Sequence, residues 1–302
     1  MFHSLDIVIQ YVASPFHLLY FITPKWIRRL VGPPRKPARA AKTARAFARE
    51  EVRNHKKNMS PGDPQDFTDF YLNQIVQSTG DPAATYDEHN LVKSMLDLFG
   101  AGIDTTAITL YWALLYMAAY PHIQATVQKE LDDVLGPSPV ICYDDRKRLP
   151  YTHAVVHEVL RYSSIFSTTF RRCTKDTVIQ GFPIKKGTTI AAILYSSLFD
   201  PEQWKTPHQF NPNHFLDEDG NFVSKEAFVP FSAGHRVCVG EQIARIELFI
   251  VLSSLLQEFT FRAPEGVKEM NMKRQSKSFI VRPQPYTICA IPRSATGKEG
   301  PW

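Results

Sequence analysis

Cysteine is scarce in this 302-residue chain: Cys142, Cys173, Cys238 and Cys289 are scattered, and no two of them form a Cys-x-x-Cys pair. This spacing excludes a disulfide scaffold, a zinc ribbon and a thioredoxin-type site. The chain has no internal repeat. It also lacks a convincing secretory signal, because polar residues interrupt residues 1–24 and no basic segment leads them. With 44% hydrophobic and 22% charged residues, it is neither disordered, collagen-like nor wholly membrane-embedded.

Acidic residues are nearly absent between Lys25 and Lys57. This segment contains twelve Lys and Arg residues and only two acidic ones, Glu50 and Glu51. This segment carries a charge of +10, whereas the rest of the chain, with 23 basic and 28 acidic residues, carries −5. Such a basic stretch fits anionic lipid, nucleic acid or an acidic partner. The simpler interpretation, which we favour, is a solvated helix face.

Long hydrophobic runs are limited to Leu98–Tyr120, which is 23 residues long and contains a single charge, Asp104. This length could span a bilayer. Asp104 lies near its start beside Gly100 and Gly102, and an acid inside a spanning helix is costly. We therefore expect a buried core helix.

Hydrophobic spacing and turn residues predict a mainly α protein with small β-sheets. We expect helices over residues 38–57, 66–77, 88–119, 122–135, 151–162 and 241–259. We expect two short strands within Thr177–Ile190 and two within Ser278–Ile291, the latter around Pro283 and Pro285.

The segment from Phe231 to Gly240, with the sequence FSAGHRVCVG, is the most informative in the chain. Cys238 lies in a glycine-bounded loop directly before a predicted helix, whose positive N-terminal end favours a thiolate. Arg236 adds a second positive charge, and Gly240 allows a flat group to approach the backbone. A lone cysteine is more often an inert buried thiol, which is the alternative.

This segment resembles the haem-ligand loop of the cytochrome P450 family, F-x-x-G-x-R-x-C-x-G. Phe231, Gly234, Arg236, Cys238 and Gly240 meet its five fixed positions. The resemblance implies that Cys238 is the axial thiolate of haem b, which favours O–O cleavage. It also implies that Arg236 pairs with a haem propionate and that Phe231 shields the sulfur.

A second motif, Ala101-Gly-Ile-Asp-Thr-Thr106, resembles the oxygen-binding helix of the same family, A-G-x-D/E-T. The resemblance implies that Ala101 leaves room for haem and oxygen, and that Asp104 and Thr105 form an acid–alcohol pair that relays protons. Cleaving O–O consumes protons in a site that must otherwise stay dry. Without this context, Asp-Thr in a helix would be a solvated face or a local side-chain bond to the backbone.

A third motif, Glu158-Val-Leu-Arg161, could be an ordinary surface ion pair. In this chain it resembles the family's E-x-x-R, which implies a structural role. Glu158 and Arg161 would join a residue of the following meander, the segment Phe210–Phe215, and support the cysteine loop. Many family members have Arg where this chain has His214, and a His there is common in the microsomal family-two-like branch.

Weaker matches to that branch imply further contacts. Arg171 corresponds to a residue near a propionate, although the adjacent Arg172 is equally able. The resemblance implies four apolar substrate contacts, which suit a lipophilic molecule: Phe166, Phe170, Phe279 and Ile280.

One competing site is a zinc centre at His153 and His157, which stand four residues apart. The zinc-protease pattern is His-Glu-x-x-His, and here Glu158 follows the second histidine instead. Because the order is wrong and no third ligand is evident, we reject zinc.

The resemblance implies a single P450 domain over residues 1–302 that corresponds to the C-terminal part of the fold. We expect 1–58 to form helices over the pocket mouth and 59–302 the haem-binding core, with the membrane anchor and early helices of the family absent. The implied activity is a haem-dependent monooxygenase that inserts one atom of dioxygen into a fatty acid, steroid or xenobiotic. The alternatives are an inactive truncated fragment, or a protein that binds a membrane surface or a partner through residues 25–57.

The implied partners are an NADPH-cytochrome reductase, cytochrome b5, dioxygen and a small lipophilic substrate. By the same resemblance we expect the cytoplasmic face of the endoplasmic reticulum membrane, a contact with the membrane surface, and no nucleic acid.

Overall fold

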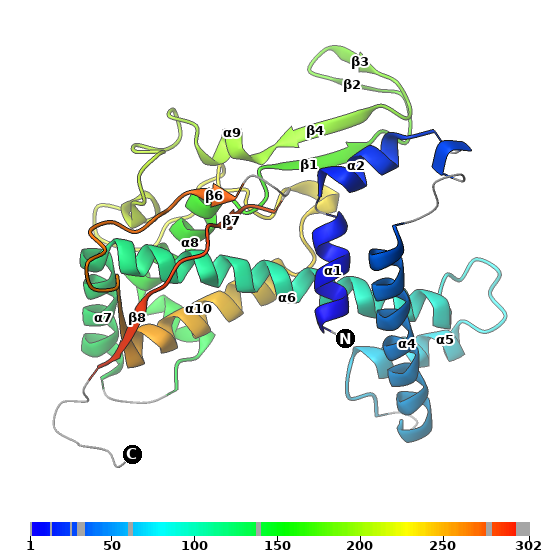
Figure 1. Cartoon of the computed structure of the whole chain (residues 1–302), viewed down its shortest axis with the longest axis horizontal. Coiled ribbons are helices and arrows are strands. Elements are labelled where there is room, and N and C mark those ends of the chain that lie inside the picture. The colour runs from blue at the N-terminus through cyan, green and yellow to red at the C-terminus, as the bar shows by residue number, and fades with distance from the viewer. Residues whose placement is uncertain are drawn as a thin grey trace. The chain divides into compact units, whose positions relative to one another are not determined.

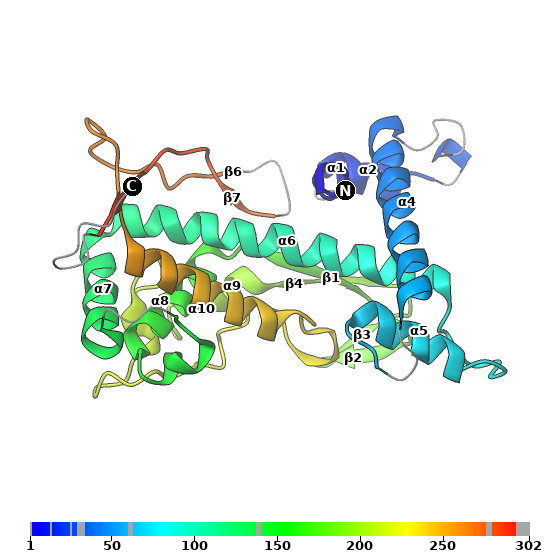
Figure 2. The same ribbon diagram turned by 90° about the horizontal axis from the view of Figure 1, so that it is seen from below.

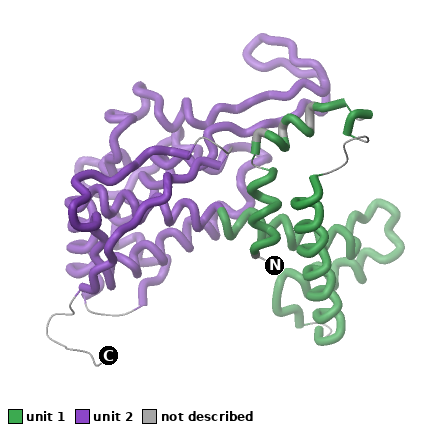
Figure 3. Tube along the Cα trace, viewed as in Figure 1, with its two compact units in different colours: residues 1–104 green, residues 105–302 purple. Residues whose placement is uncertain are grey.

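The computed structural model of the chain describes residues 2–12, 14–24, 26–28, 34–59, 63–136, 140–275 and 280–293. The Cα trace divides into two compact units, Met1–Asp104 and Thr105–Trp302 (Figure 3). The mainly α fold with small sheets is confirmed.

Helices make up the described part of the first unit. They are α1 (Phe2–Val12), α2 (Pro15–Ile22), α4 (Arg35–Asn58), α5 (Phe67–Gln77) and the first half of α6 (Glu88–Ala119) (Figure 1). Residues 35–57 of the basic stretch lie in α4, which packs against α1 and α5. Ala40, Ala44, Ala48 and Val52, spaced four residues apart, are its buried stripe. Most of its Lys and Arg residues are exposed, so the solvated face predicted from the sequence is present.

A small hydrophobic core holds the first unit together. It joins α4, α5 and the start of α6, and its buried members are Ala48, Val52, Leu72, Leu91, Val92 and Met95. The spacing of Leu91, Val92 and Met95 is that of one helical face, so this part of α6 is held by packing against its neighbours.

Helix α6 is the one described helix long and apolar enough to cross a membrane by length and composition. Within the segment Leu98–Tyr120, burial is concentrated in the second half, where Trp112, Leu115, Tyr116 and Met117 are enclosed. Leu98, Phe99 and Ile103 are exposed, so the predicted core helix holds only for the residues after about position 108.

The second unit contains the remaining helices. These are α7 (Pro121–Leu135), α8 (Pro150–Ser163), the short α9 (Leu194–Leu198) and α10 (Glu241–Glu258). Pro121 and Pro150 occupy the first helical position, where a missing N–H costs nothing. Helices α7, α8 and α10 pack on one another, as the two perpendicular views show (Figure 2).

The described strands form four two-stranded antiparallel sheets. The pairs are β1 (Thr168–Arg172) with β4 (Thr189–Ile193), β2 (Thr177–Ile179) with β3 (Phe182–Ile184), β5 (Phe259–Arg262) with β8 (Cys289–Pro292), and β6 (Arg274–Gln275) with β7 (Arg282–Pro283). The two strands predicted within Thr177–Ile190 are the β2–β3 hairpin, turning at Gln180 and Gly181, both with positive φ. Strand β4 is additional, because its partner β1 lies some twenty residues earlier and local pattern does not reveal it.

Candidate functional site

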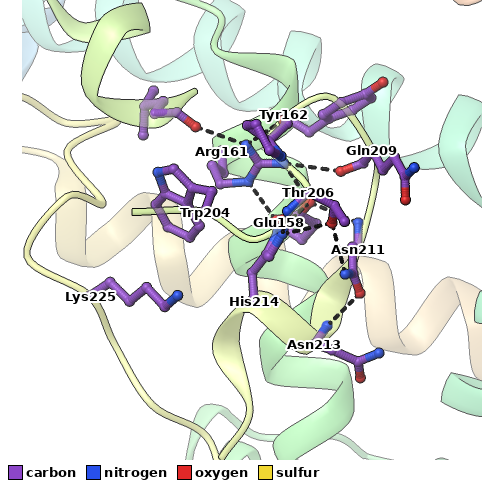
Figure 4. Close-up of polar contacts among 12 residues, drawn as sticks. Glu158, Arg161, Tyr162, Trp204, Thr206, Gln209, Asn211, Asn213, His214 and Lys225 are labelled. Atoms are coloured by element: carbon purple, nitrogen blue, oxygen red, sulfur yellow. Dashed lines mark hydrogen bonds and ion pairs between the residues drawn. The ribbon is translucent and has the colours of Figure 1, made fainter. Parts of the chain in front are cut away.

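A buried ion pair lies at the C-terminal end of α8. The side chains of Glu158 and Arg161 are both 0% exposed. Arg161 donates from Nε to Glu158 Oε2 at 2.7 Å and from Nη2 to Oε1 at 2.8 Å (Figure 4). Spacing of three residues puts both side chains on one helix face. Complete burial distinguishes this ion pair from a surface pair. Removing either partner would leave a buried charge without compensation, which would be strongly destabilising.

The other N–H groups of Arg161 fix three backbone carbonyls of the following segment. Nη1 donates to the carbonyl oxygens of Leu198 and Pro207, at 2.8 and 2.9 Å, and Nη2 donates to that of Gln209 at 3.1 Å. All five donors of the guanidinium are therefore paired. Its Cζ atom also lies 5.0 Å from the ring centre of the buried Trp204, which is cation–π distance.

Glu158 and His214 extend the cluster into the meander. Glu158 Oε1 accepts from the backbone N–H of Asn211 at 2.8 Å, and its carboxylate lies 3.3 Å from His214 Nδ1. The backbone N–H of Thr206 donates to His214 Nε2 at 3.2 Å, so Nε2 is the unprotonated nitrogen. His214 Nδ1 therefore carries the proton and donates to Glu158. The fold thus brings together the three residues grouped from the sequence.

The cysteine loop runs from Phe231 to Gly240 and leads directly into α10. The N–H of Cys238 donates to the carbonyl of Phe231 at 3.0 Å, which closes the loop. Gly234 has φ +72°, a conformation that a side chain would strain. Gly240 is the N-cap of the 18-residue α10, so Cys238 lies just before a helix N-terminus, as its position in the sequence predicts.

The surface around Cys238 is apolar and open. Cys238 is exposed, and so are Val237, Val239 (89%) and Ile243 in the same loop and the first turn of α10. A Cβ atom added at Gly240 would lie 4.0 Å from the Cys238 sulfur. Glycine at this position therefore keeps one side of the thiol uncovered.

Two arginines meet at the loop. Arg171, in β1, donates from Nη2 to the backbone carbonyl of Arg236 at 3.2 Å. Arg172 donates to the carbonyl of Gly187 instead. Because successive residues of a strand point to opposite faces, Arg171 reaches the cysteine loop and Arg172 does not. The sequence alone did not distinguish which of the two arginines faces the cysteine loop.

The acid–alcohol motif lies within the continuous helix α6. Ala101 and Thr105 are four residues apart and so share a face, and Asp104 precedes Thr105 directly. Ala101 is exposed, whereas Asp104 and Thr105 are half-buried. The carbonyl of Thr105 accepts from Thr109 Oγ1 at 2.9 Å. A Cβ at Gly102 would meet nothing within 4 Å, so the surface of the helix is open there.

Two of the expected substrate contacts are neighbours. Phe166 and Ile280 form an isolated antiparallel bridge, and the N–H of Val281 donates to the carbonyl of Ile165 at 2.8 Å. Ile280 is buried, and Phe170, in β1, is half exposed. Phe279 lies outside the described residues.

The histidine pair of α8 has no nitrogen free for a metal on His157. Its Nδ1 lies 2.9 Å from the carbonyl of His153, and its Nε2 contacts Arg245 Nη1 in α10. Burial, together with His153 and Arg245, holds the pKa of His157 well below its ordinary range. Burial and the charges of Arg146 and Arg245 lower the pKa of His153 to about 4. The sequence analysis did not predict a role for Arg245. Its position four residues after Glu241 was the feature that could have indicated one.

One described group of side chains has the composition of a metal site: His55, Asp66 and Asp69. The ring of His55 lies 2.9 Å from Asp69 and 3.6 Å from Asp66. Hydrogen bonds from His55 and from the backbone of Gln65 lower the pKa of Asp69. Because both ring nitrogens of His55 face carboxylates, the three side chains are in contact with one another.

The chain matches known proteins over nearly its whole length. The family model described as Cytochrome P450 matches residues 2–290. Human "Cytochrome P450 2J2" and mouse "Cytochrome P450 2J5" are each 42% identical over 290 residues, which are 96% of this chain and 57% of the relative. Human "Cytochrome P450 2W1" is 40% identical over 292 residues, 96% of this chain and 59% of the relative. The chain thus spans little more than half the length of these relatives. The resemblance to the family-two-like branch is confirmed.

Proposed function

The chain belongs to the cytochrome P450 family, and we propose that it carries the haem-binding part of a haem-thiolate monooxygenase. The reaction would insert one atom of dioxygen into a lipophilic organic substrate such as a fatty acid, steroid or xenobiotic. The observation that carries this proposal is the exposed Cys238 thiol, which lies before the N-terminus of α10 in a loop closed by the Cys238–Phe231 hydrogen bond.

The donor set around Cys238 fits haem b. The exposed thiol of Cys238 supplies the sulfur that a cysteine ligand of haem iron requires. The exposed Val237, Val239 and Ile243 suit the apolar face of a macrocycle. The guanidinium groups of Arg236 and Arg171 suit its propionates, because arginine pairs with carboxylates in a bidentate way. Phe231 would shield the sulfur, and Gly234 and Gly240 give the loop its turn and its open side.

Bound haem would supply the redox chemistry that activates dioxygen, and thiolate ligation favours O–O cleavage. Asp104 and Thr105 would hold and pass protons to the site, with Ala101 leaving room beside them. Glu158, Arg161 and His214 would keep the meander rigid and so support the cysteine loop. Phe166, Phe170, Phe279 and Ile280 would line the substrate pocket. In this proposal residues 1–58 cover the pocket mouth and 59–302 form the haem-binding core.

Electrons would come from NADPH through a cytochrome reductase, with cytochrome b5 as a further donor. We expect the reductase to dock near the Cys238 loop. The family relationship supports a location on the cytoplasmic face of the endoplasmic reticulum.

A membrane-surface contact is favoured by a separate observation in the first unit. Phe16, Leu19 and Trp26 are exposed, and α4 carries exposed Lys and Arg residues. Exposed aromatic and leucine side chains together with basic residues are typical of interfacial segments. Flotation with anionic liposomes, before and after removal of the charges of Lys25–Lys57, tests this contact.

The proton relay is tested with Thr105→Ala. Haem content should stay at the wild-type level, because Thr105 would not ligate haem, while product per NADPH consumed should fall about tenfold or more. Thr106→Ala is the matched control and should keep normal coupling. Normal product yield in Thr105→Ala would remove the relay from the mechanism. Absence of haem from the purified wild-type chain would instead favour an inactive fragment or a surface-binding protein.

A further inference from the structure

His157 is a buried histidine that the proposed function does not use. It precedes Glu158 in α8, is 4% exposed, and packs its ring against Phe215, Phe222 and Phe228. A carbonyl oxygen can only accept, so the contact with the His153 carbonyl requires a proton on Nδ1. An arginine can only donate, so the contact with Arg245 requires a lone pair on Nε2. The two contacts together define a neutral ring of one tautomer.

Arg245 is held at both ends of its guanidinium. Glu241, one turn earlier in α10, accepts from Nε at 3.0 Å and from Nη2 at 2.7 Å. His157 Nε2 accepts from Nη1 at 2.5 Å. So clamped, the guanidinium lies 5.1 Å from the ring centre of Phe231 and 5.3 Å from that of Phe228.

Phe231 is the first residue of the cysteine loop. Its carbonyl accepts the N–H of Cys238 at 3.0 Å, the bond that closes the loop. A continuous set of contacts therefore runs from His157 in α8 through Arg245 in α10 and Phe231 to the backbone of Cys238. The acceptor on His157 is the only contact in this set that ties α8 to the arginine.

We propose that His157 is a positioning residue for the cysteine loop: its Nε2 fixes the guanidinium of Arg245 against Phe231 and so holds the segment that carries Cys238. The placement of the loop concerns residues of this chain alone. Its consequence for haem ligation rests on the proposed function.

Three variants separate the acceptor from the bulk of the ring. His157→Leu keeps an apolar side chain and removes the acceptor, which leaves one N–H of Arg245 unpaired. His157→Gln can return an amide oxygen close to the position of Nε2 and should restore the contact. His153→Phe is the matched control, because it changes the neighbouring half-buried histidine, whose ring is not bonded to Arg245.

Hydrogen exchange of the full chain, followed by mass spectrometry of peptides, tests the positioning directly. In His157→Leu the peptide over Phe231–Gly240 should exchange about tenfold faster, since a hydrogen bond to a charged group is lost. The segments 177–184 and 259–262, which do not contact His157, should keep wild-type rates. His157→Gln should return the loop to within a factor of two or three, and His153→Phe should leave it unchanged.

Two results would overturn the proposal: wild-type exchange of the loop in His157→Leu, or equal acceleration of every segment, which would mean that His157 only stabilises the fold. If His157→Leu does not fold, Arg245→Met removes the other end of the contact and must accelerate the same loop alone. The double variant should match the single ones, because both remove one interaction.

Haem-loaded chain adds a spectroscopic readout. The fraction of the reduced, carbon-monoxide-bound protein with the thiolate-type Soret band should fall in His157→Leu and Arg245→Met and recover in His157→Gln. An unchanged fraction would show that the loop is held without His157. If the wild-type chain binds no haem, the proposed function fails while the exchange experiment still decides the positioning.

Discussion

The buried cluster around Arg161 and the loop around Cys238 belong to the same unit and are built in opposite ways. In the cluster both charged side chains are fully enclosed and every donor of Arg161 is paired. In the loop the thiol and its neighbours are exposed, and few hydrogen bonds hold the backbone. The comparison separates a buried structural charge cluster from an exposed loop that we propose as the ligand site.

The difference has a physical cause. Burying a charged group is costly unless protein partners replace its hydrogen bonds to water. Glu158 and Arg161 therefore need a complete set of hydrogen-bond partners. A group that binds a ligand must instead stay reachable, and it is then held from outside by more rigid elements. In our proposal these elements are, for Cys238, helix α10 and, through Arg245, helix α8.

The largest effect is expected from Arg161→Leu. The variant leaves Glu158 as an uncompensated buried charge and three carbonyls without donors, so the free energy of unfolding should fall by about 3–5 kcal/mol. Urea unfolding measures this. Arg53→Leu, which breaks the exposed pair with Glu50, is the control and should change stability by less than about 0.5 kcal/mol. A loss below about 1 kcal/mol in Arg161→Leu would contradict the account.

Acid should weaken the contact between α8 and α10. The pKa of His153 is about 4 and that of His157 is lowered, against 6.5 for an ordinary histidine. The unfolded chain therefore binds more protons than the folded chain below about pH 6.5, so the free energy of unfolding is retained above that pH and falls toward pH 4. Urea midpoints between pH 7.5 and 5 should show this fall.

His153→Phe should reduce the pH dependence, because one of the two groups with a lowered pKa is gone. Asp69 does not affect the pH dependence between pH 7.5 and 5. The stabilisation that comes from its lowered pKa is lost only below its ordinary pKa of 3.8. Equal slopes in wild type and His153→Phe would contradict the assignment.

The two neighbouring arginines of β1 sharpen the comparison at the loop. If haem binds as proposed, Arg171→Ala should weaken haem retention about tenfold, since the proposed arginine–propionate contact would be lost. Arg172→Ala should leave it unchanged, because Arg172 bonds Gly187 on the other face. Titration of each variant with haem measures the difference. Equal losses of haem affinity in the two variants would mean that Arg171 has no special role in haem binding.

The smallest change in stability is expected from Cys238→Ser. The thiol is exposed, so the substitution should shift the free energy of unfolding by no more than about 0.5 kcal/mol. Urea unfolding of the haem-free chain measures it. A loss above about 2 kcal/mol would mean that Cys238 supports the fold and does not serve as an open ligand position.

Local sequence pattern predicted the motifs and the long helices α4 to α8 and α10, but not α1, α2 or the short α9. Helix α6 begins at Glu88 and ends at Ala119 as predicted, and Cys238 lies before the N-terminus of α10. Local pattern did not predict contacts between residues far apart in the sequence. Strand β4 pairs with β1, Arg161 reaches carbonyls 37 to 48 residues away, and His157 meets Arg245 88 residues later. Such contacts depend on tertiary packing, which also decides whether Arg171 or Arg172 faces the loop.

The central claim is that Cys238 is the thiolate ligand of a haem bound by this chain. It is tested most directly by the carbon-monoxide difference spectrum of the reduced 302-residue chain with added haem. The account predicts the long-wavelength Soret band of thiolate-ligated haem, and its loss in a folded Cys238→Ser variant. No haem signal, or only the band of a haem without thiolate ligation, would contradict it.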